Sequence, residues 1–154
     1  LGMAAPSWEV ERWFNIPPGR DAVVLDDYAG QVVHLFCFQS WCPGCHSSGF
    51  PTRLAVMDMF GEADDVAFVA VQTVFEGFEV NTVAKALESA QRYGLTIPVG
   101  HDPGPNDSGS NLLRDYRTGG TPWHVIIGKD GFVHLNDFHV PIGPVCQLIE
   151  MLRR

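Results

Sequence analysis

The sequence of 154 residues lacks several features that would each indicate a particular class of protein. No apolar run reaches the roughly 20 residues that a membrane-spanning helix needs. Basic residues are few, with 10 Lys and Arg against 18 Asp and Glu, so the formal net charge is −8. A nucleic-acid surface needs clustered positive charge, and this balance argues against one. Four cysteines are too few for a disulfide-stapled scaffold.

The N-terminal stretch also lacks the pattern of a secretory signal. The residues LGMAAPSWEVERWF have neither the basic start nor the apolar centre of such a signal. Leu1 and Gly2 look like residues added ahead of a natural Met3. We therefore expect a cytoplasmic protein without a membrane segment; the alternative is an exported or membrane-anchored protein whose signal has been removed.

What the sequence does contain is an alternation of strand-like and helix-like segments. Apolar, β-rich runs predict buried strands at 32–39 and 64–75. A shorter strand is expected at 96–102, and two β-rich runs around Lys129-Asp130-Gly131 predict a hairpin over 123–138. Ahead of these strands, residues 21–31 indicate a short extended segment and a turn at Ala29-Gly30.

Helices are predicted at 45–60, 81–93, 111–117 and 144–154 from the spacing of apolar residues. The first should bury Leu54, Met57 and Phe60, and Pro51 should kink it or interrupt its first turn. Asn81 is expected to cap the second helix. The order of the segments predicts one α/β domain over residues 1–154, with a mixed central sheet and helices on both faces.

The segment with the clearest chemistry is SWCPGC, in which Pro43 and Gly44 separate Cys42 from Cys45. It follows a predicted buried strand and opens a predicted helix. Unpaired N–H groups and the helix dipole favour negative charge at a helix start, and the thiolate is the reactive form of cysteine. Cys45 lies one helical turn further on, within disulfide reach. We predict that Cys42 is the nucleophile and Cys45 the resolving thiol, rather than a static bridge.

Together with Thr121-Pro122 ahead of the last hairpin, this segment resembles the active site of the thioredoxin superfamily. The stretch LDDYAGQVVHLFCFQSWCPGC resembles the TlpA/ResA-like (redoxin) branch of that superfamily. The likeness covers nearly the whole chain. It implies a thioredoxin fold with an N-terminal hairpin, a helix–strand insertion at about 80–101, and a thiol–disulfide oxidoreductase activity.

The resemblance also implies which residues meet the substrate and what the substrate is. It implies that Thr121-Pro122 is a cis peptide opposite the cysteines, where the backbone pairs with a substrate peptide. The implied partners are protein disulfides or dithiols and an upstream thiol electron donor or acceptor, with no organic cofactor or metal. The expected substrate-contacting residues are Trp41, Pro43, Gly44, Thr121, Pro122 and Trp123.

One departure from the family pattern concerns proton transfer. Thioredoxin has a buried acid where this chain has Phe36, and the HSSG segment after Cys45 lacks the carboxylate of ResA-like proteins. His46 is the local titratable candidate for proton transfer, and His124 beside the expected cis-proline is a second. The other two cysteines, Cys37 and Cys146, are expected to be small buried residues without a catalytic part.

Three other functions remain open from the sequence. Zinc or copper binding would use Cys42, Cys45 and His46 with His134 or His139, but a second ligand pair at tight spacing is absent. A thiol peroxidase would carry Thr or Ser three residues before the reactive cysteine, where this chain has Gln39. A non-enzymatic adaptor would use only the peptide groove of the fold.

Overall fold

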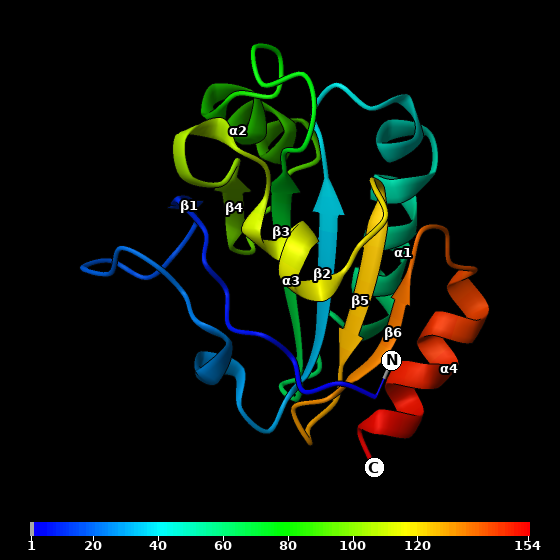
Figure 1. The fold of residues 1–154 in the computed structure, drawn as a ribbon. Coiled ribbons are helices and arrows are strands. Elements are labelled where there is room, and N and C mark those ends of the chain that lie inside the picture. Colours follow the sequence, from blue (N-terminus) through cyan, green and yellow to red (C-terminus); the bar gives the residue numbers. More distant parts are fainter. Residues whose placement is uncertain (1) are drawn as a thin grey trace.

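The computed structural model describes residues 2–154 and is built around one mixed sheet of six strands, in the order β1-β4-β3-β2-β5-β6 (Figure 1). The neighbours β2, β3 and β4 are parallel, whereas β1, β5 and β6 each run antiparallel to the strand beside them. This arrangement confirms the predicted mixed sheet. The strands are β1 (Arg12–Phe14), β2 (Val32–Phe38), β3 (Val66–Thr73), β4 (Val99–Asp102), β5 (Trp123–Ile127) and β6 (Val133–Asp137).

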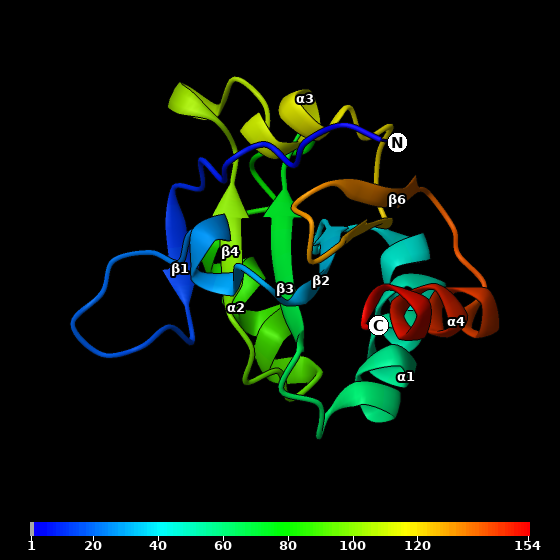
Figure 2. The ribbon, with the colours of Figure 1, turned by 90° about the horizontal axis from the view of Figure 1, so that it is seen from below.

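Helices cover both faces of the sheet, as predicted. Viewed from below, α1, α2 and α4 lie on one side of the strands, and α3 lies on the other side with the N-terminal segment (Figure 2). No helix in residues 2–154 is long and apolar enough to cross a membrane. The helices are α1 (Phe50–Phe60), α2 (Val83–Arg92), α3 (Asn111–Tyr116) and α4 (Ile142–Leu152).

The two central strands are buried on both faces because their sequences are apolar at nearly every position. Every residue of β2 and β3 is buried. Successive side chains alternate between the two faces of a strand. Leu35 and Cys37 therefore pack toward the N-terminal segment and α3, whereas Phe36 and Phe38 pack toward α1 and α2. This double burial holds the end of β2, where the cysteines follow, in a fixed place.

The predicted N-terminal hairpin is wrong. Leu25–Tyr28 forms a single 3₁₀ turn, and β1 pairs with β4. The carboxylate of Asp27 accepts the N–H of Val24 at 2.8 Å and pairs with Arg20 at 2.7 Å. A side chain that satisfies the local backbone in this way favours a turn over an extended strand.

The predicted helix at 45–60 is present but interrupted near its start. Helical backbone begins at Pro43, Cys45–Gly49 forms a π-helical turn, and α1 follows from Phe50. The interruption lies directly ahead of Pro51, which has no N–H for the helical ladder. The predicted interruption of the first turn is therefore confirmed.

The buried side of α1 differs from the predicted one. Phe60 is buried as expected, but Leu54 and Met57 are only half-buried. The other fully buried positions are Phe50, Arg53 and Val56. The helix therefore faces the sheet with a charged residue at its centre, which an apolar pattern does not predict.

The helix–strand pair expected between residues 80 and 101 is present as α2 and β4. The N-cap of α2 is Thr82, whose hydroxyl accepts the N–H of Lys85 at 3.3 Å, and the predicted cap at Asn81 is wrong. The side chain of Asn81 is instead used near the cysteines. Gly94 ends this segment with a positive φ of 64°, as its position predicts.

Both edges of the sheet are short or partly covered. β1 has three residues. Along β6, the N–H of Gly2 donates to the carbonyl of Val133, and the N–H of Val133 donates to the carbonyl of Met3, each at 2.9 Å. Part of the N-terminal segment thus occupies the outer side of the last strand.

Candidate active site

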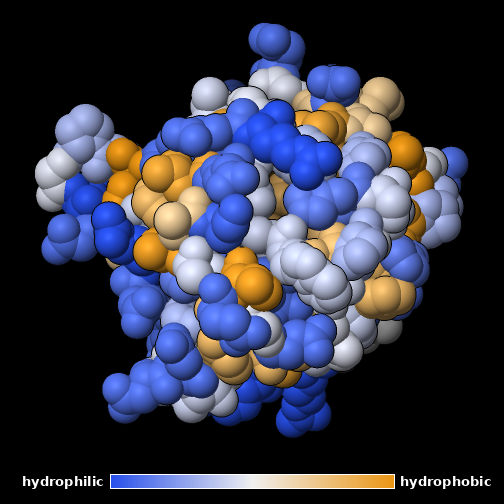
Figure 3. All heavy atoms as spheres, turned by 90° about the horizontal axis from the view of Figure 1, so that it is seen from above, coloured by the Kyte–Doolittle hydropathy of each residue, from blue (hydrophilic) through white to orange (hydrophobic). Residues whose placement is uncertain are grey.

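The cysteine pair lies where β2 ends and the interrupted helix begins, at the upper end of the view in Figure 1. Cys42 and Cys45 are joined in a disulfide, with their Cα atoms 5.3 Å apart. Cys42 is half-buried, whereas Cys45 is completely buried. A partner can therefore reach only Cys42. From above, hydrophobic side chains on this end of the molecule form small patches separated by hydrophilic ones (Figure 3).

The sulfur of Cys42 is surrounded by hydrogen-bond donors. The backbone N–H of Cys45 lies 3.2 Å from it, and the hydroxyl of Thr121 lies 3.6 Å from it. The helical backbone that starts at Pro43 adds the partial positive charge of a helix start. Donors aimed at a sulfur stabilise its thiolate relative to the neutral thiol. The surroundings of Cys42 therefore suit a nucleophilic sulfur.

The loop opposite the cysteines brings backbone close to the same sulfur. The peptide between Thr121 and Pro122 is cis, and the carbonyl oxygen of Thr121 lies 3.7 Å from Cys42 Sγ. Pro122 packs directly on the end of the π-helical turn, since a Cβ on Gly49 would lie only 2.6 Å from the Cβ of Pro122. Glycine at position 49 is what permits this close approach.

The two tryptophans beside the site have different surroundings. Trp41 is 69% exposed, whereas Trp123 is half-buried and packs against the hydrophobic core. The indole N–H of Trp123 donates to Asn136 Oδ1 at 2.5 Å, which fixes its ring beside the cis-proline loop. Trp41 therefore offers the larger surface to a partner.

Side chains from β3 and the following loop hold the segment that precedes Cys42. The N–H of Ser40 donates to Gln72 Oε1 at 2.7 Å, and the N–H of Trp41 donates to Asn81 Oδ1 at 2.8 Å. We name these two contacts, made by Gln72 and Asn81, the amide clamp. Sequence reasoning missed both residues. The available signal was a polar residue, Gln72, near the end of a buried apolar strand.

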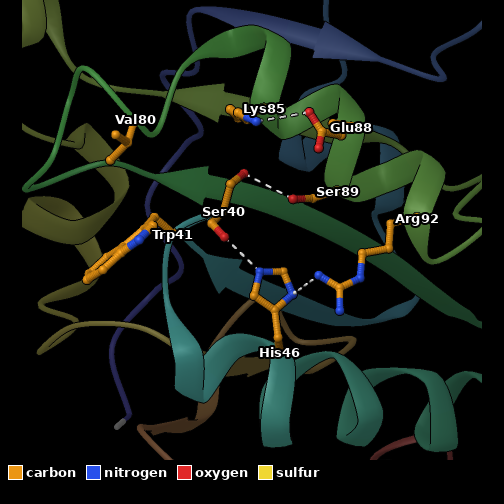
Figure 4. Close-up of a pocket in the computed structure, with 8 residues that line it drawn as sticks. All are labelled: Ser40, Trp41, His46, Val80, Lys85, Glu88, Ser89 and Arg92. Atoms are coloured by element: carbon orange, nitrogen blue, oxygen red, sulfur yellow. Dashed lines mark hydrogen bonds and ion pairs between the residues drawn. The ribbon is translucent and has the colours of Figure 1, made fainter.

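His46 points into the space between α2 and the helical segment that begins at Pro43, here called the site helix (Figure 4). Its Nε2–H donates to the carbonyl of Ser40 at 2.7 Å, so its Nδ1 accepts from the hydroxyl of Tyr93 at 2.6 Å in the neutral form. Nη1 of Arg92 lies 3.4 Å from the same nitrogen. The ring of His46 is thus held by Ser40, Tyr93 and Arg92.

His124 lies in the core, stacked against a second histidine that sequence reasoning did not single out. Its Nδ1 lies 3.0 Å from His34 Nε2, and both side chains are buried. Burial, with the nearby charges of Arg53 and His139, lowers the pKa of His124 to about 3. Burial, again with Arg53, also lowers the pKa of His34 well below its ordinary value. The pair is therefore neutral near pH 7 and does not supply an imidazolium acid.

A buried arginine lies where the sheet faces α1. Arg53 Nη2 donates to the carbonyls of His34 and Val69 at 2.6 Å each, and within residues 2–154 no carboxylate pairs with it. Burial lowers the pKa of Arg53 to about 9. The guanidinium carbon lies 5.5 Å from the ring centroid of Phe36. Phe36, which stands where thioredoxin has its buried acid, thus packs against the guanidinium of Arg53.

The remaining two cysteines are not placed for exchange. Cys37 is buried in β2, and burial raises the pKa of its thiol to about 12. Cys146 is half-buried on α4, and burial raises the pKa of its thiol as well. Near pH 7 both remain thiols rather than thiolates. Full burial was predicted correctly for Cys37 but not for Cys146.

The residues considered for a metal site are not brought together. His134 pairs with Asp130 at 3.0 Å, and His139 lies 3.4 Å from the hydroxyl of Ser48. In the part of the chain that the structure describes, no group of three or more His, Cys, Asp or Glu residues is arranged to hold a metal ion. Gln39, at the position considered for a peroxidase, accepts the N–H of Phe75 at 3.2 Å through its carbonyl oxygen. It serves there to hold the loop after β3.

Comparison with known proteins agrees with this geometry. The Redoxin family model matches residues 2–138. A thioredoxin-like superfamily protein, SPOA0173, is 32% identical, with a TM-score of 0.88, over 98% of this chain and 96% of that one. A thiol-disulfide isomerase from Corynebacterium glutamicum is 25% identical, with a TM-score of 0.82, over 96% of each chain. No match was found among curated protein sequences.

Proposed function

Since the chain belongs to the Redoxin family and is a thioredoxin-like thiol–disulfide oxidoreductase, we propose that it exchanges electrons with the disulfides of partner proteins through Cys42 and Cys45. One observation carries the proposal. The half-buried sulfur of Cys42 lies at a helix start, bonded to a buried Cys45 and facing the backbone of Thr121. This arrangement supports attack by one sulfur and resolution by the other.

The proposed exchange proceeds in two displacements. The Cys42 thiolate attacks one sulfur of the partner disulfide, a bond forms between them, and the second partner sulfur leaves as a thiolate that takes up a proton. Cys45, after losing its proton, attacks Cys42 Sγ. The Cys42–Cys45 bond forms, and the first partner sulfur leaves as a thiolate that is protonated. The partner gains two electrons and two protons, which the dithiol loses.

The partner chain is proposed to lie along the cis-proline loop. The Thr121 carbonyl lies beside the reactive sulfur, and a substrate backbone pairing there would bring its own sulfur into line. Trp41, Pro43 and Gly44 would contact the substrate on one side, and Pro122 and Trp123 on the other. Pairing with backbone rather than side chains suits an enzyme that accepts several partners.

The chemistry requires a thiol electron donor or acceptor but no organic cofactor. The direction of exchange depends on the reduction potential of the dithiol relative to that of its surroundings, and the Pro43-Gly44 sequence alone does not give that value. We propose a reducing role in the cytoplasm, where thiols are kept reduced. Measurement of the dithiol potential against glutathione tests this direction, and a potential near that of strong oxidants would contradict it.

The function is tested by reduction of insulin with dithiothreitol as electron donor. The wild-type protein should accelerate the reaction, and Cys42→Ser should abolish the acceleration because the attacking sulfur is gone. Cys146→Ser serves as the matched control and should keep the wild-type rate. Full activity in Cys42→Ser would rule out the proposed exchange. Iodoacetamide applied to the reduced protein at mildly acidic pH should label Cys42 first; preferential labelling of Cys45 or Cys37 would overturn the assignment.

A further inference from the structure

A hollow of about 510 Å³ opens beside the nucleophile, between the start of the site helix and α2 (Figure 4). Ser40, Trp41 and His46 line it from the segment that carries the cysteines. The facing wall comes from α2 and the loop before it. The hollow is therefore formed jointly by the active-site segment and the helix–strand pair at 80–101.

The wall contributed by α2 holds a cation without a carboxylate partner. Lys85 Nζ pairs with Glu88 at 3.2 Å, so these two lining charges offset each other. Arg92 forms no ion pair with any carboxylate in residues 2–154. Its guanidinium carbon lies 5.2 Å from the ring centroid of Tyr93, and Nη1 is directed toward His46. The hollow thus carries a net positive charge on a chain whose formal net charge is −8.

The opposite end of the hollow is apolar and adjoins the cysteines. Trp41 is 69% exposed and Val80 is 41% exposed. Trp41 directly precedes Cys42 in the chain, so this end is formed by the neighbour of the nucleophile. Between the two ends, the hydroxyl of Ser89 donates to the hydroxyl of Ser40 at 3.0 Å. A ligand in the hollow therefore meets an apolar surface near the sulfur and an arginine further away.

We propose that this hollow selects partner peptides that carry an Asp or Glu side chain close to the cysteine being exchanged. The carboxylate pairs with the guanidinium of Arg92, and an apolar residue beside the partner cysteine packs on Trp41 and Val80. A guanidinium is well suited to a carboxylate because its N–H groups match the two oxygens. This inference rests on the proposed function, since it assigns a substrate preference to the same site.

Paired peptides with a single internal disulfide test the preference. They are identical except for Glu or Gln two residues from the first cysteine, and the dithiol form of the protein reduces each of them. At low ionic strength the ratio of kcat/KM for the Glu peptide to that for the Gln peptide should be about three to ten, as expected for one partly solvated ion pair. The ratio should fall as salt is added, because salt screens exposed charges.

Variants separate this inference from the function on which it rests. In Arg92→Gln the Glu/Gln ratio should fall to about one, whereas Arg154→Gln, which removes an exposed arginine elsewhere, should keep the wild-type ratio. A ratio near one in the wild-type protein, or a ratio unchanged by Arg92→Gln, would overturn the acidic preference. Cys42-dependent reduction of the Gln peptide in the same assay would still support the exchange. Absence of reduction of either peptide and of insulin would overturn both.

Discussion

At the scale of single residues, the unusual feature is a set of ionisable groups buried between the sheet and α1. Arg53, His34 and His124 are all buried, and their pKa values are all lowered chiefly by burial. Among residues 2–154, Nδ1 of His34 and two nitrogens of Arg53 find no hydrogen-bond partner. Groups of this kind cost folding free energy when they carry charge. They make the stability of this protein depend on pH.

We expect the free energy of unfolding to fall as the pH is lowered from 6.5. The folded-state pKa of His124, about 3, lies below its ordinary value of 6.5, so the unfolded chain binds a proton first. His124 alone should cost about 2 kcal/mol between pH 7 and pH 5, and the loss should continue until the pH passes the folded-state value. His34 acts in the same direction. Urea unfolding at pH 7, 6 and 5 measures the loss.

The variant His124→Gln should lower the number of protons taken up on unfolding by about one. The slope of the free energy of unfolding against pH should therefore fall by about 1.4 kcal/mol per pH unit at its steepest part. Gln147→Ala, an exposed change on α4 that removes no ionisable group, is the control and should keep the wild-type slope. Equal stability of the wild-type protein at pH 7 and pH 5 would contradict the expectation.

At the scale of elements, the amide clamp links the loop before α2 to the segment that carries the nucleophile. Asn81 accepts the N–H of Trp41 at 2.8 Å and donates to the carbonyl of Glu76 at 3.1 Å. Gln72 likewise accepts from Ser40 and donates to the carbonyl of Thr82 at 3.0 Å. The active-site segment is therefore fixed from β3 and the start of α2, as well as from its own strand.

We expect Asn81→Ala to lower kcat/KM for insulin reduction about tenfold, because small displacements of a reacting group cost catalysis steeply. The free energy of unfolding should fall by about 1 kcal/mol, since the part-buried N–H of Trp41 loses its partner. Thr82→Ala, which removes the neighbouring helix cap, should lower stability by about 1 kcal/mol and leave activity unchanged. Equal activity loss in the two variants would show that the effect is one of general stability.

The elements were predictable from the sequence where their pattern was local and strong. The apolar runs at β2 and β3 and the alternation around Lys129-Asp130-Gly131 were sufficient. The turn at Leu25–Tyr28 was not, because the bonds of Asp27 to Val24 and Arg20 decide it. Arg53 was missed because apolar spacing places a charged residue on the solvent side, and only the tertiary packing shows otherwise.

The active site, too, was predictable from the sequence only in part. The cysteine pair was identified from its sequence and its place between a strand and a helix. Asn81, Gln72 and Arg92 were missed because they lie 40, 32 and 46 residues from their partners near the cysteines. Contacts over such separations depend on how β3 and α2 pack beside β2, which periodicity does not reveal.

At the scale of the whole molecule, we expect the fold to be independent of its disulfide. The bridge closes a loop at a sequence separation of three, whereas the sheet joins residues from Arg12 to Asp137. A bridge across so short a loop restricts the unfolded chain little. The predicted single domain over 1–154 should accordingly unfold as one unit in either redox state.

We expect reduction of the Cys42–Cys45 bond to change the free energy of unfolding by no more than about 2 kcal/mol, the chain-entropy value for so short a loop. Guanidinium unfolding of the oxidised and reduced protein, followed by tryptophan fluorescence and circular dichroism, measures the difference. One coincident transition should appear by both probes in each state. Unfolding on reduction would identify the bond as a structural support, and two separate transitions would contradict the single domain.

The borders of the sheet bear on how the protein avoids self-association. The unpaired edge of a sheet can pair with a strand of another chain. A protein whose partners expose extended backbone is often close to chains that could pair in this way. Here one border is a three-residue strand, and the other is partly bonded to Met3 and its neighbour. In the exchange proposed above, an incoming chain would pair with the cis-proline loop, where contact lasts for one exchange, rather than along a border, where it would nucleate aggregation.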